Sequence, residues 1–260
     1  MEVQVLLSFM LLTLLFSKGN GAGKPYPHAG NATGKPDQYA GNVEIMLLNG
    51  GHQTIWPGVY TKTGHQILPT GFKLEPRDIY YIKAPDSWSG TIWARTGCSG
   101  DPNAAFRCDV GDCGTGSIHC HQNLPKPPAT LLKFDLAPKG GTSSYKIDLR
   151  YGFNLPVSLS TSTGECKQIN CVRDMRNDCP DWLAVYSHEE RKVGCKSACY
   201  TTGQKKDCCT GAFASPQKCE LNEYTQLVEN NCPDSVSNAF DDTHFTCYGG
   251  SSFRITFWAW

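Results

Sequence analysis

Residues 108–120 read Cys108-Asp-Val-Gly-Asp-Cys113-Gly-Thr-Gly-Ser-Ile-His-Cys120, a run in which cysteine and glycine recur at short intervals. The chain of 260 residues holds 14 cysteines, and none of them precedes Cys98. An even and unusually high number of cysteines is typical of proteins that form disulfides in an oxidising compartment. The cysteines therefore predict a secreted, disulfide-bonded protein.

The composition favours strands and loops and argues against several functions. Lysine and arginine together number 24, as do aspartate and glutamate. This balance argues against a basic nucleic-acid surface or an acidic tail. Only 18% of the residues are charged, whereas glycine and proline number 26 and 16, which favours sheets and turns over helical bundles.

The N-terminal region has the features of a targeting segment. An apolar run from Val5 to Phe16 is too short to span a bilayer but suits a signal peptide, which we expect at residues 1–22. Residues 23–41 are polar and predict a flexible arm, with the sequon Asn31-Ala-Thr33 as its glycosylation site. No later segment is apolar enough for a transmembrane anchor. We expect a secreted, extracellular monomer with no nucleic-acid partner.

Short alternating segments, rich in β-branched and aromatic residues, recur after residue 42. They predict strands at residues 43–48, 54–56, 79–82, 91–95, 130–136, 145–150 and 253–258. Helical periodicity is confined to the region between Cys166 and Cys232, for example at residues 220–230. The sequence thus divides into a β core (about 42–97, 121–165 and 233–260), an insertion (98–120) and a cysteine-rich, partly helical lobe (166–232).

The cysteine spacing does not suit a metal site, and the common catalytic motifs are absent. Cys113, His119, Cys120 and His121 are close in sequence, but the chain has no Cys-x-x-Cys pair, as a structural zinc site would need. The even cysteine count leaves no obvious free thiol as a nucleophile. Signatures of serine hydrolases, zinc peptidases and P-loop proteins are absent. We therefore predict no metal and no cofactor.

Several longer segments carry a resemblance to a known family. They include Trp56-Pro-Gly-Val, Trp93-Ala-Arg-Thr-Gly-Cys98, the run from Cys108 to Cys120, Tyr151-Gly-Phe-Asn-Leu-Pro156, Cys195-Lys-Ser-Ala-Cys199 and Asp207-Cys-Cys-Thr-Gly211. In this order they resemble the thaumatin-like proteins, the secreted osmotin-type and pathogenesis-related proteins of plants, over about residues 43–258. The resemblance implies a mainly β fold: an antiparallel β-sandwich core, a disulfide-rich, partly helical lobe and a small disulfide-closed hairpin insertion.

The resemblance also implies a disulfide pattern, which spacing alone does not select. The implied bridges are Cys98–Cys108, Cys113–Cys120, Cys166–Cys247, Cys171–Cys232, Cys179–Cys195, Cys199–Cys208 and Cys209–Cys219. Similar members have an eighth bridge between the first and last strands, where this chain has Gly51 and Trp258. We therefore expect a less firmly tied N-terminal edge.

The family is associated with an acidic cleft that binds, and in some members hydrolyses, β-1,3-glucans. The positions that match the cleft's acids hold Lys133, Lys146 and Tyr151, and the position of its arginine holds Phe72. Only the last acid is retained, at Asp241 or its neighbour Asp242. The resemblance therefore implies a cleft that is no longer acidic.

Asp135 and Asp148 lie two residues beyond Lys133 and Lys146, on the same strand faces. They are candidate displaced carboxylates, although neighbouring lysines would lower the pKa that a proton donor needs raised. The alternative is an ion-pair ladder of little energetic value.

The replaced acids favour a protein that is not an enzyme. We expect a secreted, apoplastic defence or stress protein, antifungal in type, that binds cell-wall polysaccharide or a microbial surface component. One alternative is a weak endo-β-1,3-glucanase that uses Asp241 with Asp135 or Asp148. Another is an inhibitor of a microbial wall-degrading hydrolase, which would bind a protein ligand.

Overall fold

The computed structural model describes residues 42–161, 164 and 166–259. The predicted signal peptide (1–22), the arm (23–41) and Asn31 lie outside these residues. The described residues form one compact unit. None of the helices that the structure describes is long and apolar enough to cross a membrane.

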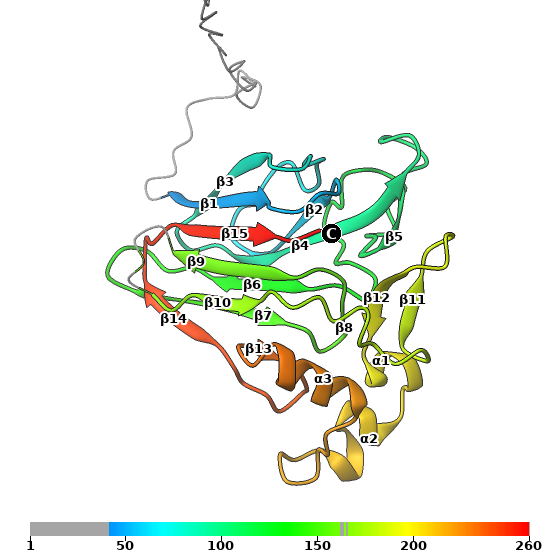
Figure 1. Ribbon diagram of the computed structural model, residues 1–260. Helices are drawn as coiled ribbons and strands as arrows, with labels where there is room; N and C mark the ends of the chain where they lie inside the picture. The colour runs from blue at the N-terminus through cyan, green and yellow to red at the C-terminus, as the bar shows by residue number, and fades with distance from the viewer. Residues whose placement is uncertain (1–41, 162–163, 165, 260) are drawn as a thin grey trace, which may run out of the picture. The chain divides into compact units, whose positions relative to one another are not determined.

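Two β-sheets make up the core of this unit (Figure 1). The five-stranded sheet has the order β10 (Ile169–Cys171), β9 (Val157–Thr161), β15 (Phe253–Phe257), β1 (Asn42–Asn49) and β3 (Ile79–Pro85). All neighbours in it are antiparallel except β1 and β15.

The seven-stranded sheet is built around four long antiparallel strands. Its order is β13 (Ser235–Val236), β7 (Thr142–Asp148), β6 (Leu131–Asp135), β4 (Ser89–Ser99) and β2 (Trp56–Thr63), with β14 (Phe245–Tyr248) on β7 and β5 (Arg107–Val110) on β4. The hairpin between β6 and β7 turns at Gly140, whose φ of 94° lies in the region that glycine tolerates best.

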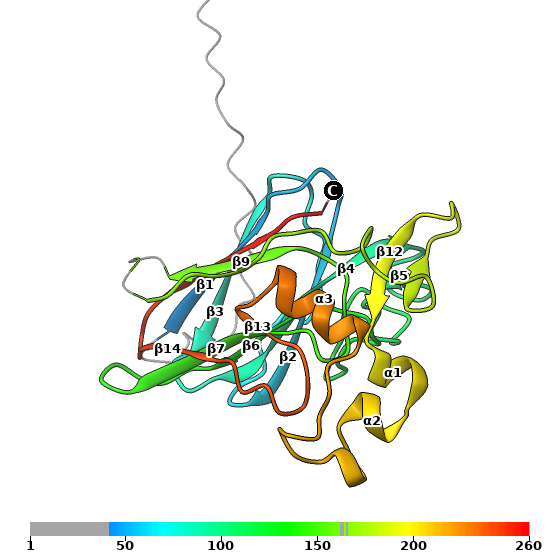
Figure 2. The same ribbon diagram turned by 60° about the horizontal axis from the view of Figure 1, so that its bottom comes forward.

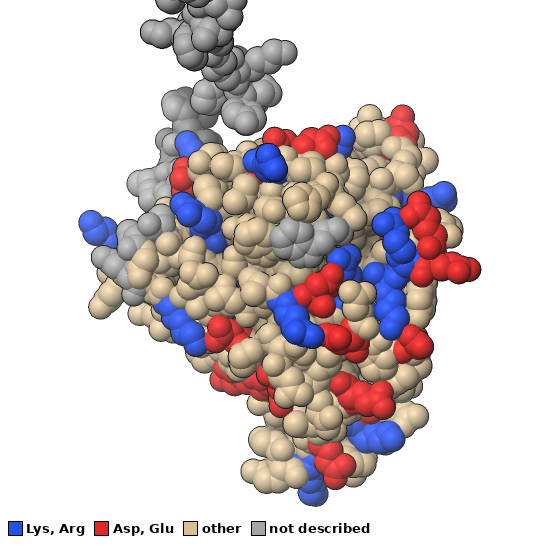
Figure 3. All heavy atoms as spheres, in the orientation of Figure 1, with Lys and Arg blue, Asp and Glu red and all other residues tan. Residues whose placement is uncertain are grey.

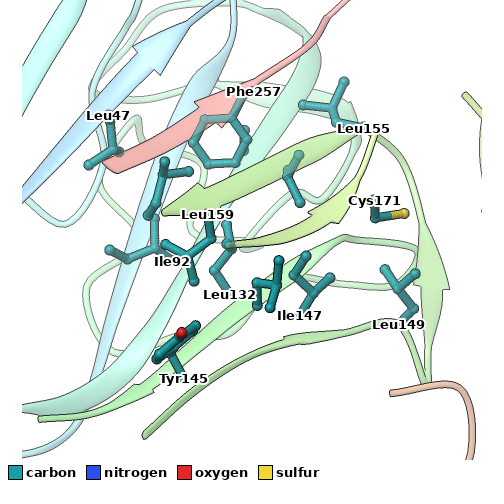
Figure 4. Close-up of a cluster of buried hydrophobic side chains, with 14 of the residues drawn as sticks. Leu47, Ile92, Leu132, Tyr145, Ile147, Leu149, Leu155, Leu159, Cys171 and Phe257 are labelled. Atoms are coloured by element: carbon teal, nitrogen blue, oxygen red, sulfur yellow. The ribbon is translucent and has the colours of Figure 1, made fainter. Parts of the chain in front are cut away.

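The inner faces of the two sheets pack against each other to form the hydrophobic core. Leu47, Leu159 and Phe257 come from the five-stranded sheet, and they meet residues such as Leu132 and Ile147 from the other sheet (Figure 4). These five side chains are fully buried. The period-two burial along β9 and β7 is the pattern of strands with one face in a core. The mainly β sandwich predicted from the sequence is confirmed.

The lobe combines a small sheet with short helices. The sheet has the order β11 (Ala184–Tyr186), β12 (Lys192–Lys196) and β8 (Gly152–Phe153). The helices are α1 (Ala198–Thr202), α2 (Lys205–Cys208), the 3₁₀ turn η1 (Gly211–Phe213) and α3 (Glu223–Asn231). Figures 1 and 2 show α1, α2 and α3 gathered on one side of the two large sheets.

Seven disulfides join the fourteen cysteines in the pairs that the family resemblance implies. Cys171–Cys232 connects β10 to the end of α3, and Cys166–Cys247 reaches β14. The other bridges close shorter loops within the insertion and the lobe. No described cysteine is free.

One segment lies outside its expected region, and the position of one strand was not predicted. Residues 169–171, placed in the lobe by their cysteines, form the edge strand β10 of the five-stranded sheet. The N-terminal strand β1 is not an edge strand, because it lies between β15 and β3. A parallel pairing with β15 that spans Ile45–Asn49 holds it there, and the alternating pattern gave no sign of that pairing.

Candidate functional site

Lys133 and Lys146 face each other across two antiparallel strands. Lys133 lies on β6 and Lys146 on β7, and the register pairs the two residues directly. The residues on both sides of each lysine in sequence are buried, so both lysines point to the outer face of the sheet. Two of the expected cleft positions therefore lie together.

A buried carboxylate lies at one end of this lysine pair. Asp148 is only 1% exposed, and its Oδ2 accepts hydrogen bonds from Lys133 Nζ and from Arg150 Nη2, both at 2.6 Å. Arg150 Nε also donates to Asp148 Oδ1 at 3.0 Å, which makes the arginine contact two-pronged. One buried anion is thus shared by two cations.

The state of Asp148 follows from these contacts. Burial alone would raise its pKa, but the hydrogen bonds from Arg150 and the charge of Lys133 outweigh burial and lower the pKa to about 2. The same contacts raise the pKa of Arg150, because hydrogen bonding to Asp148 favours its charged form. Asp148 is therefore a permanent carboxylate at physiological pH.

A small pocket begins next to Arg150. Arg150 and Tyr151 line a cavity of about 80 Å³ with residues of the lobe, among them Ser197, Asn222 and Asn238. Tyr151 is 47% exposed. Figure 3 shows lysine, arginine and acidic side chains interleaved over much of the visible surface, without a large field of one sign.

Helix α3 is fixed at this pocket by its N-terminus. The Asn222 side chain caps the helix by accepting from the backbone N–H groups of Tyr224 and Thr225. The buried Tyr224 hydroxyl donates to the Leu149 carbonyl at 2.6 Å, one residue from Asp148. Burial raises the pKa of Tyr224 well above its ordinary value, so the hydroxyl stays protonated.

The retained acid Asp241 is occupied by its own loop. Its Oδ2 accepts from the Ser237 N–H at 2.8 Å, and its Oδ1 accepts from the N–H and the hydroxyl of Thr243. It lies close enough to Arg150 to raise the pKa of that residue further. The neighbouring Asp242 is exposed and pairs with His244.

Asp135 lies at the other end of the lysine pair from Asp148. In the register, Asp135 is opposite Ser144 and Asp148 is opposite Leu131, so the two acids are displaced in opposite directions. Four residues along antiparallel strands correspond to about 13 Å. Asp135 also accepts a hydrogen bond from the Ser89 hydroxyl. The two predicted displaced carboxylates are therefore not brought together.

Phe72 is not part of this group. Its ring packs in the hydrophobic core and stacks on Tyr80, with the ring centroids 4.0 Å apart. The residues that do gather are Lys133, Lys146, Asp148, Arg150 and Tyr151, which we call the basic row. The prediction missed Arg150, although its i, i+2 spacing from Asp148 was the available signal.

The described residues offer no obvious metal centre. No group of three or more His, Cys, Asp or Glu side chains among them is arranged to hold a metal ion. The rings of His119 and His121 lie 6.3 Å apart beside Cys120, which is bonded to Cys113.

Comparisons with known proteins show that the chain is similar to plant proteins of one family. Residues 49–259 match the profile of the thaumatin family. The chain is 39% identical over 221 residues to thaumatin-like protein 1a of Malus domestica, covering 82% of this chain and 89% of that protein.

Two further relatives differ in the functions that their names indicate. The chain is 38% identical over 208 residues to a glucan endo-1,3-beta-glucosidase of Prunus avium, covering 78% of this chain and 85% of that protein. It is 37% identical over 218 residues to pathogenesis-related protein 5 of Arabidopsis thaliana, covering 82% and 89%.

Proposed function

Because the chain belongs to the thaumatin family, we propose that it is a secreted defence- or stress-type protein that binds polysaccharide without hydrolysing it. The bound polymer belongs to the plant cell wall or to a microbial surface. The single observation that carries the proposal is the state of Asp148, which is buried and bonded to both Lys133 and Arg150.

Hydrolysis needs an acid that donates a proton and a second carboxylate about 5–9.5 Å away. Asp148 does not meet the first requirement, because its pKa of about 2 keeps it ionised. Both oxygens of Asp241 are engaged by Ser237 and Thr243. Asp135 is separated from Asp148 by about 13 Å along the strands. These arrangements support binding over catalysis.

A weak endo-β-1,3-glucanase is the second candidate, because one relative carries that name. In that function Asp241 would act with Asp135 or Asp148. A glucanase of this kind would need the Asp241 loop to open before catalysis.

Reducing-end release from laminarin separates the two candidates. We expect the purified protein to release no more sugar than a triple variant with Asp135→Ala, Asp148→Ala and Asp241→Ala. Retention on insoluble glucan, xylan and pectin is measured in parallel with the folded wild-type protein. Release above the variant's level would replace the binding function by the glucanase, and failure to be retained on any polymer would refute binding.

Secretion is part of the same proposal. Expression of the full chain in plant cells is expected to deliver a protein that lacks about the first 22 residues, as the signal-peptide pattern predicts. An Asn31→Gln variant is expected to migrate faster than wild type, because Asn31 is the predicted glycan site. Intracellular retention of the full chain would contradict secretion.

A further inference from the structure

The direct pairing of two lysines is unfavourable for the fold. Like charges directly opposite each other on antiparallel strands are destabilising. Lys133 has Asp148 as a partner, but Lys146 makes no ion pair with any described residue. Local arrangements that reduce stability in this way are expected at functional sites. The lysine pair therefore calls for a ligand that compensates it.

Three cations, Lys133, Lys146 and Arg150, lie near two carboxylates on this face, Asp148 and, at the other end of the lysine pair, Asp135, which accepts from the Ser89 hydroxyl. Lys133 and Arg150 share the single carboxylate of Asp148, and Lys146 adds a third cation. The acids beside the strands on the other edge of β7 are Asp234, which pairs with Lys167, and the exposed Asp242, whose carboxylate lies 3.6 Å from Nδ1 of His244. Asp241 is held by its own loop. An anionic group is the complement of such a surface.

The surface continues in both directions from the lysine pair. The register aligns four residues across neighbouring strands, namely Tyr60, Thr91, Lys133 and Lys146. At the usual strand spacing they extend over about 14 Å. On the lobe side, Arg150 leads to the exposed Tyr151 and to the small pocket that both residues line. Partly exposed tyrosines next to hydroxyl and amide groups suit sugar rings, because a ring face can stack on them.

We propose that the basic row binds the carboxylate groups of an acidic polysaccharide, with Lys146 and Lys133 contacting one uronate unit and Arg150 with Tyr151 holding the neighbouring part of the chain. This inference rests on the proposed polysaccharide-binding function and names its ligand class. A sugar carboxylate fits better than an acidic peptide, because the basic row combines cations with the exposed Tyr151 and leads to a pocket whose lining includes Ser197, Asn222 and Asn238. The carboxylate that also lines this pocket, Asp207, accepts a hydrogen bond from the Thr202 hydroxyl.

The test compares matched ligands and matched variants. The ligands are an oligogalacturonate, its methyl ester, a laminarin oligosaccharide and an oligoglutamate, each titrated calorimetrically into the full mature protein. The variants are Lys146→Glu and, as a control of equal charge change, Lys83→Glu on the exposed edge strand β3. Thermal unfolding of each variant is recorded beside the titrations.

Wild type is expected to bind the oligogalacturonate more tightly than its methyl ester and the oligoglutamate. Lys146→Glu should weaken this binding by about tenfold or more, the usual effect of losing a charged hydrogen bond, and Lys83→Glu should not. The melting temperature of Lys146→Glu should equal or exceed that of wild type, because the like-charge pair is removed.

Three results would overturn the inference. One is equal affinity for the oligogalacturonate and its methyl ester, and another is an equal effect of the two lysine variants. The third is tighter binding of oligoglutamate, which would indicate an acidic protein as the partner. In each of these cases, retention of wild type on neutral glucan would leave the proposed binding function intact.

Discussion

Gly51 occupies a position where the fold leaves no room for a side chain. A Cβ atom there would lie 2.1 Å from the Ala259 carbonyl oxygen and 2.3 Å from its nitrogen. The same carbonyl accepts hydrogen bonds from the N–H groups of His52 and Gln53, at 2.7 and 3.2 Å. Backbone contact at this point thus holds together the segments that follow β1 and β15, which no disulfide joins.

Gly51→Ala is therefore expected to lower the free energy of unfolding by about 1–3 kcal/mol, the usual cost of overpacking a tight site. Gly140→Ala is a suitable comparison, because nothing lies within 4 Å of its Cβ position and any cost there arises from its φ of 94° alone. Urea denaturation measures both variants. A Gly51→Ala protein as stable as wild type would show that the strand ends separate easily.

Asp148 gives a second prediction at the scale of one residue. Its pKa is lowered from 3.8 to about 2, so its ion pairs stabilise the folded state fully above pH 4. This stabilisation is lost as the pH falls through the folded-state pKa, near pH 2. We expect Asp148→Asn to unfold about 3–5 kcal/mol more easily at pH 7, because two cations lose their buried partner.

The difference between wild type and Asp148→Asn should shrink as the pH falls from 4 to 2, when the wild-type carboxylate is protonated too. Urea unfolding at several pH values in this range measures the difference in free energy of unfolding between the two proteins. Arg173 and Asp178 form an exposed pair, and an Asp178→Asn variant serves as the control with little effect at any pH. A pH-independent difference would mean that the ion pairs do not contribute as described.

At the scale of elements, alternation predicted the strands with the most β-branched and aromatic residues. Of the predicted segment 145–150, residues 145–148 lie in β7, and of the predicted segment 253–258, residues 253–257 form β15. β9 was missed, because its outward positions are serines at Ser158 and Ser160 and resemble a loop. The pairing of Lys133 with Lys146 could not be predicted either, since a register depends on the hairpin's length and on the partner strand.

The sequence also did not predict the burial of Asp148. An aspartate that alternates with apolar residues at the end of a strand usually faces solvent, and the sequence therefore favoured an exposed ladder. In the structure Asp148 is 1% exposed, and next to it the Leu149 carbonyl accepts from the Tyr224 hydroxyl of α3. The charge of Lys133, which lowers the pKa of Asp148 together with the local contact from Arg150, is brought there by the strand register.

Helix α3 provides the element-scale prediction. Tyr224→Phe removes only the hydroxyl that donates to the Leu149 carbonyl, so the free energy of unfolding should fall by about 1–2 kcal/mol. Tyr200→Phe, at an exposed tyrosine of α1, is the matched control. Hydrogen exchange should show faster opening of residues 223–231 in Tyr224→Phe alone. Unchanged exchange there would mean that other contacts anchor the helix.

At the scale of the described unit, the disulfides differ in how much of the chain they constrain. Cys171 and Cys232 are 61 residues apart in sequence and join the five-stranded sheet to α3, whereas Cys199 and Cys208 are 9 apart within the lobe. In the chain-entropy description, a bridge that closes a longer loop restricts the unfolded chain more. The long bridges should therefore contribute most to stability.

A double Cys171→Ala, Cys232→Ala variant is expected to lose about 2 kcal/mol more than a double Cys199→Ala, Cys208→Ala variant, from the ratio of loop lengths. Burial of Cys171 and Cys232 in the core adds to the difference, because their removal leaves a cavity. Guanidinium unfolding of both proteins measures it. Equal losses would show that the lobe is held to the β-sandwich by side-chain packing and by the Cys166–Cys247 bridge, with little contribution from Cys171–Cys232.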